Sequence, residues 1–122
     1  SGFYQFDSRD AYGDLSSSTG DDLIYIQMIQ GSDGLNWATL AISISVDSGA
    51  SIQCSEGGGG DCTYETADGS MWDVSEEILI SEGSADLCDG SNGYCEITVV
   101  ITKLGVGDED DRIIAQLSAY AE

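Results

Sequence analysis

Residues 40–47 read Leu40-Ala41-Ile42-Ser43-Ile44-Ser45-Val46-Asp47, with an aliphatic side chain at every even position and a small or polar one at most odd positions. A period of two is typical of a β-strand that is buried on one face, whereas an amphipathic helix repeats about every 3.6 residues. This stretch therefore predicts an antiparallel strand whose even-numbered side chains enter the core.

The same alternation recurs along most of the chain. Longer runs lie at residues 23–30, 77–82, 94–103 and 112–120, and shorter candidates lie at 50–54, 62–66 and 70–74. Turn sequences rich in Gly, Ser and Asp separate these runs. About seven or eight short strands at this spacing predict an all-β fold, a single antiparallel two-sheet β-sandwich of immunoglobulin-like type. Residues 111–120 also fit helical spacing, but the β-branched Ile113 and Ile114 favour a strand.

The chain has 122 residues, the size of one domain. We predict a polar connector over residues 1–21 and the β-sandwich domain over residues 22–122. Three aromatic side chains, Phe3, Tyr4 and Phe6, lie in this connector outside the alternating pattern. They either form a contact surface for a partner or fold back onto the domain.

The charge is strongly one-sided, since 23 acidic side chains face three basic ones and give a formal charge of −20. Such a negative field repels phosphate and argues against nucleic acid or anionic lipid as partners. Histidine is absent, which removes the commonest general base, and no serine or cysteine has an evident activating neighbour. We therefore expect no catalytic activity. The acidic surface fits a high-salt or marine source, because salt screens self-repulsion.

The four cysteines form two close pairs, and each pair brackets a turn-rich segment. Of the three possible pairings, this favours the local one, Cys54–Cys62 with Cys88–Cys95. Disulfides indicate an oxidising, extracytoplasmic setting. Four reduced core cysteines are an alternative reading. A zinc centre fits less well, because seven and six intervening residues exceed the usual short spacing of zinc ligands.

Two acidic loops are candidates for calcium, which prefers hard oxygen ligands on flexible backbone. The candidate ligands are Asp86, Asp89 and Glu96 in one loop and Asp108 and Asp110 in the other. Their spacing does not match the EF-hand loop, and solvated acidic loops are the alternative at this net charge. No other cofactor is expected.

Two tryptophans, Trp37 and Trp72, each precede an aliphatic strand. A carbohydrate-stacking platform is one possible role for such rings. We expect them instead to fill the core, as tryptophans do in many sandwiches.

Several segments in order resemble archaeal type IV pilin-like proteins, the family of archaellins and adhesion pilins. The segments are Ser1-Gly2-Phe3, residues 31–37 leading into 40–44, Met71-Trp72, residues 76–82 and residues 97–101. The sequence departs from the family in its four cysteines, in the absence of Asn-x-Ser/Thr sites and in having no N-terminal helix. The resemblance implies a small outward-facing β-sandwich that follows a hydrophobic helix in the filament core.

From this resemblance we expect an extracellular, cell-surface structural or adhesive domain of a filament subunit. Self-assembly would use a hydrophobic helix of about 20 residues that ends near Ser1 in a longer, processed protein. A surface-layer component or a cell-surface receptor is the expected partner, and this segment itself is not expected to contact the membrane. The alternative is a secreted or membrane-anchored binding module, either similar to the archaellum stator proteins or calcium-dependent.

Overall fold

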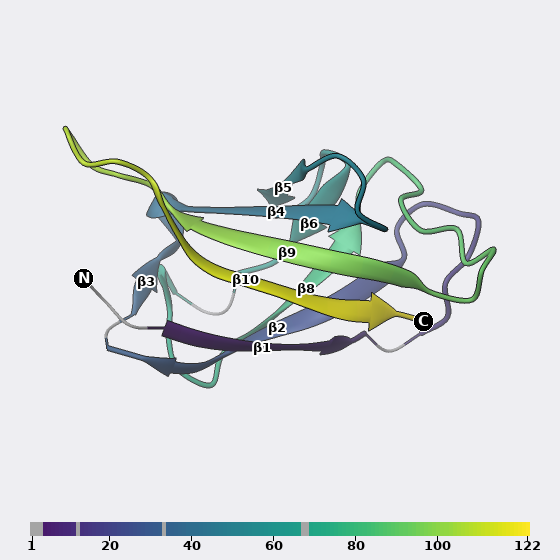
Figure 1. Ribbon diagram of the computed structural model, residues 1–122, viewed down its shortest axis with the longest axis horizontal. Coiled ribbons are helices and arrows are strands. Elements are labelled where there is room, and N and C mark those ends of the chain that lie inside the picture. The colour runs from purple at the N-terminus through teal and green to yellow at the C-terminus, as the bar shows by residue number, and fades with distance from the viewer. Residues whose placement is uncertain (1–3, 12, 33, 67–68) are drawn as a thin grey trace.

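The computed structural model describes residues 4–11, 13–32, 34–66 and 69–122, and throughout these residues the protein is all-β (Figure 1). The elements in chain order are β1 (Tyr4–Asp10), β2 (Asp22–Gly31), β3 (Leu35–Asn36), a 3-10 turn η1 (Trp37–Thr39), β4 (Leu40–Val46), β5 (Ile52–Glu56), β6 (Cys62–Tyr64), β7 (Met71–Trp72), β8 (Glu77–Glu82), β9 (Cys95–Lys103) and β10 (Arg112–Ala121). The strand at β10 confirms the strand interpretation of residues 111–120 over the helical one.

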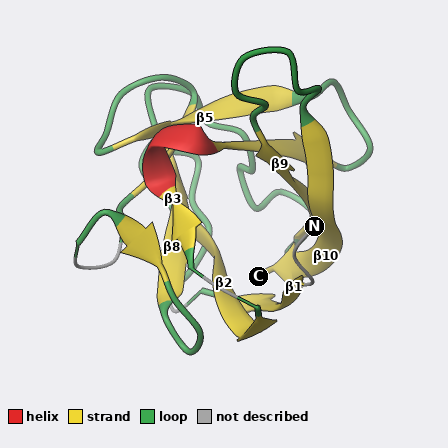
Figure 2. Cartoon of the chain, turned by 90° about the vertical axis from the view of Figure 1, so that its left-hand side faces the viewer, coloured by secondary structure: helices red, strands yellow, loops and turns green. Residues whose placement is uncertain are grey.

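Eight strands form one sheet in the order β1-β2-β8-β6-β5-β4-β9-β10. Neighbours pair antiparallel except β5 and β6, which pair in parallel. The sheet curls until its two edge strands, β1 and β10, run side by side (Figure 1), and a view along the strands shows them arranged around a common centre (Figure 2). At this seam the Ser8 hydroxyl donates to the Ser118 carbonyl (3.1 Å), and the Glu122 N–H donates to the Asp10 carboxylate (3.0 Å).

The all-β prediction is confirmed, but the two-sheet sandwich is not, because a continuous hydrogen-bonded path joins all eight strands. The hydrogen-bonded link between the β1-β2-β8-β6 half and the β4-β9-β10 half of the sheet is short. Strand β5 reaches β4 through only two register pairs, Ser43–Gln53 and Ile44–Ile52, and continues on its other side into β6. A nearly closed, barrel-shaped sheet is therefore the better description of the architecture.

The core is built from the alternation that the sequence displays. In β4 the even-numbered residues predicted to point inward, Leu40, Ile42 and Ile44, are buried, and the odd ones between them are only partly so. The inward positions of β2, β8 and β9 add aliphatic residues from the other strands: Ile24, Ile26, Met28, Ile78, Ile80, Ile97, Val99 and Ile101. Curling the sheet brings these faces together, which buries them without a covering helix.

The small sheet β3–β7 covers one end of the core. Leu35 is the register partner of Trp72, and the ring of Trp72 stacks on Trp37 with 4.9 Å between centroids and 13° between planes. Both tryptophans are buried, which confirms that they are core residues. The Trp72 Nε1–H donates to the Glu76 carbonyl at 2.8 Å, whereas the Trp37 Nε1 is buried without a hydrogen-bond partner among the described residues.

The predicted connector over residues 1–21 is wrong for residues 4–10. Residues 4–10 form strand β1, which pairs with β2 from Tyr4–Gly31 to Asp10–Ile24. Beyond this strand Ala11 is buried, and Leu15 packs against the core. The sequence does not predict this strand, because the alternation of apolar and polar residues covers only its first two inward positions, Tyr4 and Phe6.

Both disulfides have the predicted local pairing. Cys54 and Cys62 are register partners on the parallel strands β5 and β6, with Cα atoms 4.5 Å apart. The second disulfide, Cys88–Cys95, spans 6.1 Å between Cα atoms and ties the 83–94 loop to the start of β9. The structure contains no free cysteine, so the reduced and zinc-bound alternatives do not apply to it.

The two tryptophans provide a matched test of the core. Trp72→Phe removes one of two donors to the Glu76 carbonyl, which also accepts the Met28 N–H at 3.1 Å, and the lost hydrogen bond is worth about 0.5–1.5 kcal/mol. Trp37→Phe removes an N–H that has no hydrogen-bond partner among the described residues. Both changes remove the same ring volume. Urea unfolding followed by circular dichroism should show that Trp72→Phe lowers the free energy of unfolding more than Trp37→Phe. Equal losses would contradict this account.

The disulfides enclose loops of similar length, with sequence separations of 8 and 7 residues. In the chain-entropy treatment each should contribute about 2–3 kcal/mol to the free energy of unfolding. We expect Cys54→Ala/Cys62→Ala and Cys88→Ala/Cys95→Ala each to lose roughly this amount in urea titrations. A loss well below about 1 kcal/mol for either pair would show that its loop is already ordered in the unfolded chain.

Candidate functional site

The candidate calcium ligands of the two acidic loops lie at opposite ends of strand β9. Asp86 and Asp89 lie in the loop before β9, and Glu96 lies at the beginning of that strand. Asp108 and Asp110 lie in the exposed hairpin loop after β9, at its other end. A nine-residue strand is about 27 Å long, so the two groups cannot share an ion.

Two of the residues predicted as ligands in the first loop form local hydrogen bonds, Asp89 through its carboxylate and Glu96 through its backbone N–H. The Asp89 carboxylate accepts the Ser91 N–H at 2.8 Å, and hydrogen bonds from the backbone and side chain of Ser91 lower the pKa of Asp89. The Glu96 N–H donates to the Asp47 carboxylate at 2.9 Å, which joins β9 to the turn after β4. Asp89 therefore stabilises a turn, and the backbone of Glu96 helps to fix the β4 turn.

Asp86 instead joins a cluster with Asp21 and Glu82, in which one carboxylate oxygen of each lies within 4.8 Å of the others. Three separate segments supply these residues: Asp21 precedes β2, Glu82 ends β8, and Asp86 lies in the following loop. Within the part of the chain that the structure describes, this is the one group of three side chains close enough to share a metal ion.

Glu82 is the buried member of this cluster, with 3% of its surface exposed. Its two carboxylate oxygens accept the backbone N–H groups of Asp21 (3.1 Å) and Cys88 (2.8 Å). Burial raises the pKa of Glu82, and the negative charges of Asp21 and Asp86 raise it further. The two backbone hydrogen bonds act in the opposite direction and lower this pKa, but the net shift is upward. The carboxylate thus ties the 11–21 loop and the 83–94 loop to the end of β8.

The cluster offers oxygen ligands of the kind that Ca²⁺ prefers, but most of its oxygens have protein partners. The two Asp21 oxygens accept the Ser16 N–H (2.7 Å) and the Ser16 hydroxyl (2.8 Å). Calcium usually takes about six to eight oxygen ligands. Three carboxylates could supply part of that number, and the rest would have to come from water or backbone carbonyls.

Sequence reasoning missed Asp21 and Glu82, although Glu82 carried a usable signal. Ile78, Ile80 and Glu82 occupy the successive inward positions of β8, so the alternation itself places a carboxylate at a core position. A charged side chain at such a position needs specific partners. Asp21 carried no comparable signal, because it is one of many acidic residues in a polar loop.

Of the three aromatic residues predicted to contact a partner, two are described, and both pack on the domain. The Phe6 ring lies 4.9 Å from the Trp72 ring between centroids, and Tyr4 and Phe6 are half-buried against the core. Phe3 lies outside the described residues. Tyr4 and Phe6 line one side of a surface groove of about 370 Å³ between β1 and β10, which Ile29, Ile114 and Leu117 also line.

Four exposed aliphatic side chains lie on strands and loops near the end of the sheet where β1 and β10 begin. Ile29 (48% exposed) lies near the end of β2, and Ile113 (61%) lies near the beginning of β10. Val106 (67%) lies in the hairpin loop between β9 and β10. Val74 (47%) precedes Ser75, whose N–H donates to the Met28 carbonyl at 2.7 Å. The opposite end carries a pair of exposed tyrosines, Tyr94 and Tyr120.

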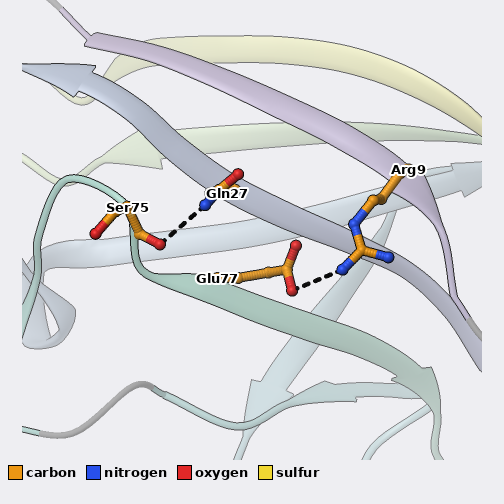
Figure 3. A network of polar contacts seen from close by, with 4 residues as sticks. All are labelled: Arg9, Gln27, Ser75 and Glu77. Carbon is orange, nitrogen blue, oxygen red and sulfur yellow. Dashed lines mark hydrogen bonds and ion pairs between the residues drawn. The ribbon is translucent and has the colours of Figure 1, made fainter.

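The basic side chain of Arg9 has a local role. Arg9 forms an ion pair with Glu77 at 3.0 Å across the outer face of β1, β2 and β8 (Figure 3), and its guanidinium lies 4.3 Å from the centroid of the Tyr25 ring. On the same face the Gln27 side chain donates to the Ser75 carbonyl at 3.0 Å (Figure 3). These contacts order the surface of the sheet.

The described part of the chain contains no helix with the length and apolarity required to cross a membrane. No protein-family model matches the sequence, and comparisons with curated proteins and with solved structures found no match.

The raised pKa of Glu82 predicts a specific pH dependence. The folded protein binds this proton more tightly than the unfolded chain does, so Glu82 favours folding at low pH and loses this contribution as the pH rises through its raised pKa. Melting temperatures from about pH 7 to about pH 4 should show the wild type gaining stability relative to Glu82→Gln. The exposed Glu109→Gln is the control and should follow the wild type. If the melting temperatures of wild type and Glu82→Gln changed in parallel with pH, the raised pKa of Glu82 would be contradicted.

Proposed function

We propose that this chain is the outward-facing structural or adhesive domain of an extracellular filament subunit of the archaeal type IV pilin-like kind. On this proposal the fold is a β-sandwich of two sheets. Strands β1, β2, β8 and β6 face β4, β9 and β10 across one core, and the short β5 joins the two groups. That arrangement is compatible with a sandwich whose two sheets have merged at one edge.

The apolar end of the sheet is the observation that carries the proposal. Its exposed aliphatic residues are Ile29, Val74, Val106 and Ile113, in a chain whose formal charge is −20. These aliphatic side chains are available at this end of an otherwise acidic domain for contact with a neighbouring subunit. The strand β1 begins at the same end, so a segment preceding β1 would enter the domain beside this surface.

The setting of the protein is part of the proposal. Two disulfides stabilise the loops next to β5 and β9, and such bonds persist in oxidising, extracytoplasmic compartments. The acidic surface keeps domains apart except where apolar residues or salt allow them to approach. Subunits arranged along a filament would need this balance of repulsion and local contact.

The experiment images the full-length protein in its native envelope by electron microscopy, with variants introduced at the natural locus. Ile29→Asp and Val106→Asp each add a charge to the apolar end and should abolish or greatly reduce filaments, because burying a carboxylate in an apolar contact is costly. Asn92→Asp adds the same charge to an exposed loop at the opposite end and should leave filaments intact. All three isolated domains should keep the wild-type circular dichroism spectrum.

Wild-type cells without filaments containing this protein would overturn the proposal.

The acidic cluster Asp21–Glu82–Asp86 favours a second candidate, a secreted or membrane-anchored module that binds its ligand with calcium. In that case millimolar calcium would raise the melting temperature well beyond KCl of equal ionic strength. Asp86→Asn would remove this extra stabilisation, and Asp108→Asn, at the other end of β9, would not.

A further inference from the structure

Two tyrosines stand exposed at the end of the sheet where β1 and β10 finish. Tyr94, directly before β9, and Tyr120, in β10, are 52% and 53% exposed. Their rings contact each other edge to face, with 5.6 Å between centroids and 75° between planes. The two rings therefore form the walls of an open corner on the protein surface.

The backbone on both sides of this corner is fixed. Tyr94 adjoins Cys95, which the disulfide holds to Cys88, and Tyr120 is the register partner of Glu96 within the β9–β10 pair. Because the two rings project from a cross-linked segment and a paired strand, ordering them costs little when a ligand binds. An exposed aromatic pair on such a support is suited to recognition.

One carboxylate lines the corner, and others lie near it on the adjoining backbone. Glu122 lines a shallow hollow of about 280 Å³ together with the two tyrosines, and Glu96 lies opposite Tyr120. Asp47 and Asp10 accept the backbone N–H groups of Glu96 and Glu122, at 2.9 and 3.0 Å, which places two more carboxylates next to these residues. The hollow thus combines two aromatic rings with one lining carboxylate and further acidic residues close by, in a chain whose formal charge is −20.

We propose that this corner binds the lysine or arginine side chains of a basic segment on a partner protein. A cation over an aromatic ring is attracted by the quadrupole of the ring, and nearby carboxylates add to the attraction. The hollow is open and is lined by few residues, which suits the end of one side chain rather than an enclosed small molecule. A sugar ring would stack better on a flat face than in a corner whose walls stand at 75°.

This inference goes beyond the filament proposal, because it concerns only the opposite end of the domain. The test titrates the 122-residue chain with a peptide of alternating glycine and arginine while aromatic NMR signals are recorded. The same peptide with citrulline in place of arginine keeps nearly the same shape but lacks the charge, and it has a carbonyl acceptor where arginine has an NH2 donor. We expect the arginine peptide to shift the ring signals of Tyr94 and Tyr120, and the citrulline peptide to leave them unchanged.

Variants then separate a site from general attraction to an acidic protein. Tyr94→Leu and Tyr120→Leu should each weaken binding about two- to fivefold, the size of an exposed cation–π contact. Glu96→Gln/Glu122→Gln should weaken it about two- to tenfold. The control Asp108→Asn/Glu109→Gln also removes two negative charges, but at the distant hairpin. It should weaken binding less than Glu96→Gln/Glu122→Gln does.

Three results would each overturn the proposal. The first is equal weakening by the two double variants together with no effect of the leucine substitutions, which would show non-specific electrostatic attraction. The second is binding of the citrulline peptide with unchanged affinity. The third is a shift of the same ring signals by a neutral oligosaccharide and not by the arginine peptide, which would assign the corner to sugars.

Discussion

The apolar face of the sheet must be buried against the sheet itself, because no helix in the described residues covers it. Curling brings the inward aliphatic residues of β2 and β8 against those of β4 and β9. The same closure places β1 beside β10 and sets Phe6 on Trp72. The positions of the tryptophans, the seam and both ends of the molecule follow from this one constraint.

Closure also leaves the molecule with two chemically different ends. At one end the stacked tryptophans cover the core, and exposed aliphatic side chains lie on strands and loops at the same end. At the other end the buried carboxylate of Glu82 holds two loops together by accepting the N–H groups of Asp21 and Cys88. Apolar burial organises the first end, and charge-assisted hydrogen bonding organises the second.

This polarity gives the proposed function its physical basis. A domain with an apolar contact surface at one end and an aromatic, acidic corner at the other can hold a neighbour and a partner at the same time. The long strands β9 and β10 connect the two ends through a rigid pair, which fixes their separation. The remaining surface is dominated by carboxylates, which repel other anions and leave these two regions as the natural points of contact.

Local features of the sequence determined most of the strands, the turns between them and both disulfides. The alternation in residues 40–47 and 77–82 predicted β4 and β8, and the short spacing of each cysteine pair predicted its partner. Only the tertiary structure decided that the sheet nearly closes, that β1 belongs to it, and that Glu82 meets Asp21 across 61 positions of sequence. The reason is that periodicity is set by the geometry of consecutive residues, whereas strand partners are chosen by burial of the whole core.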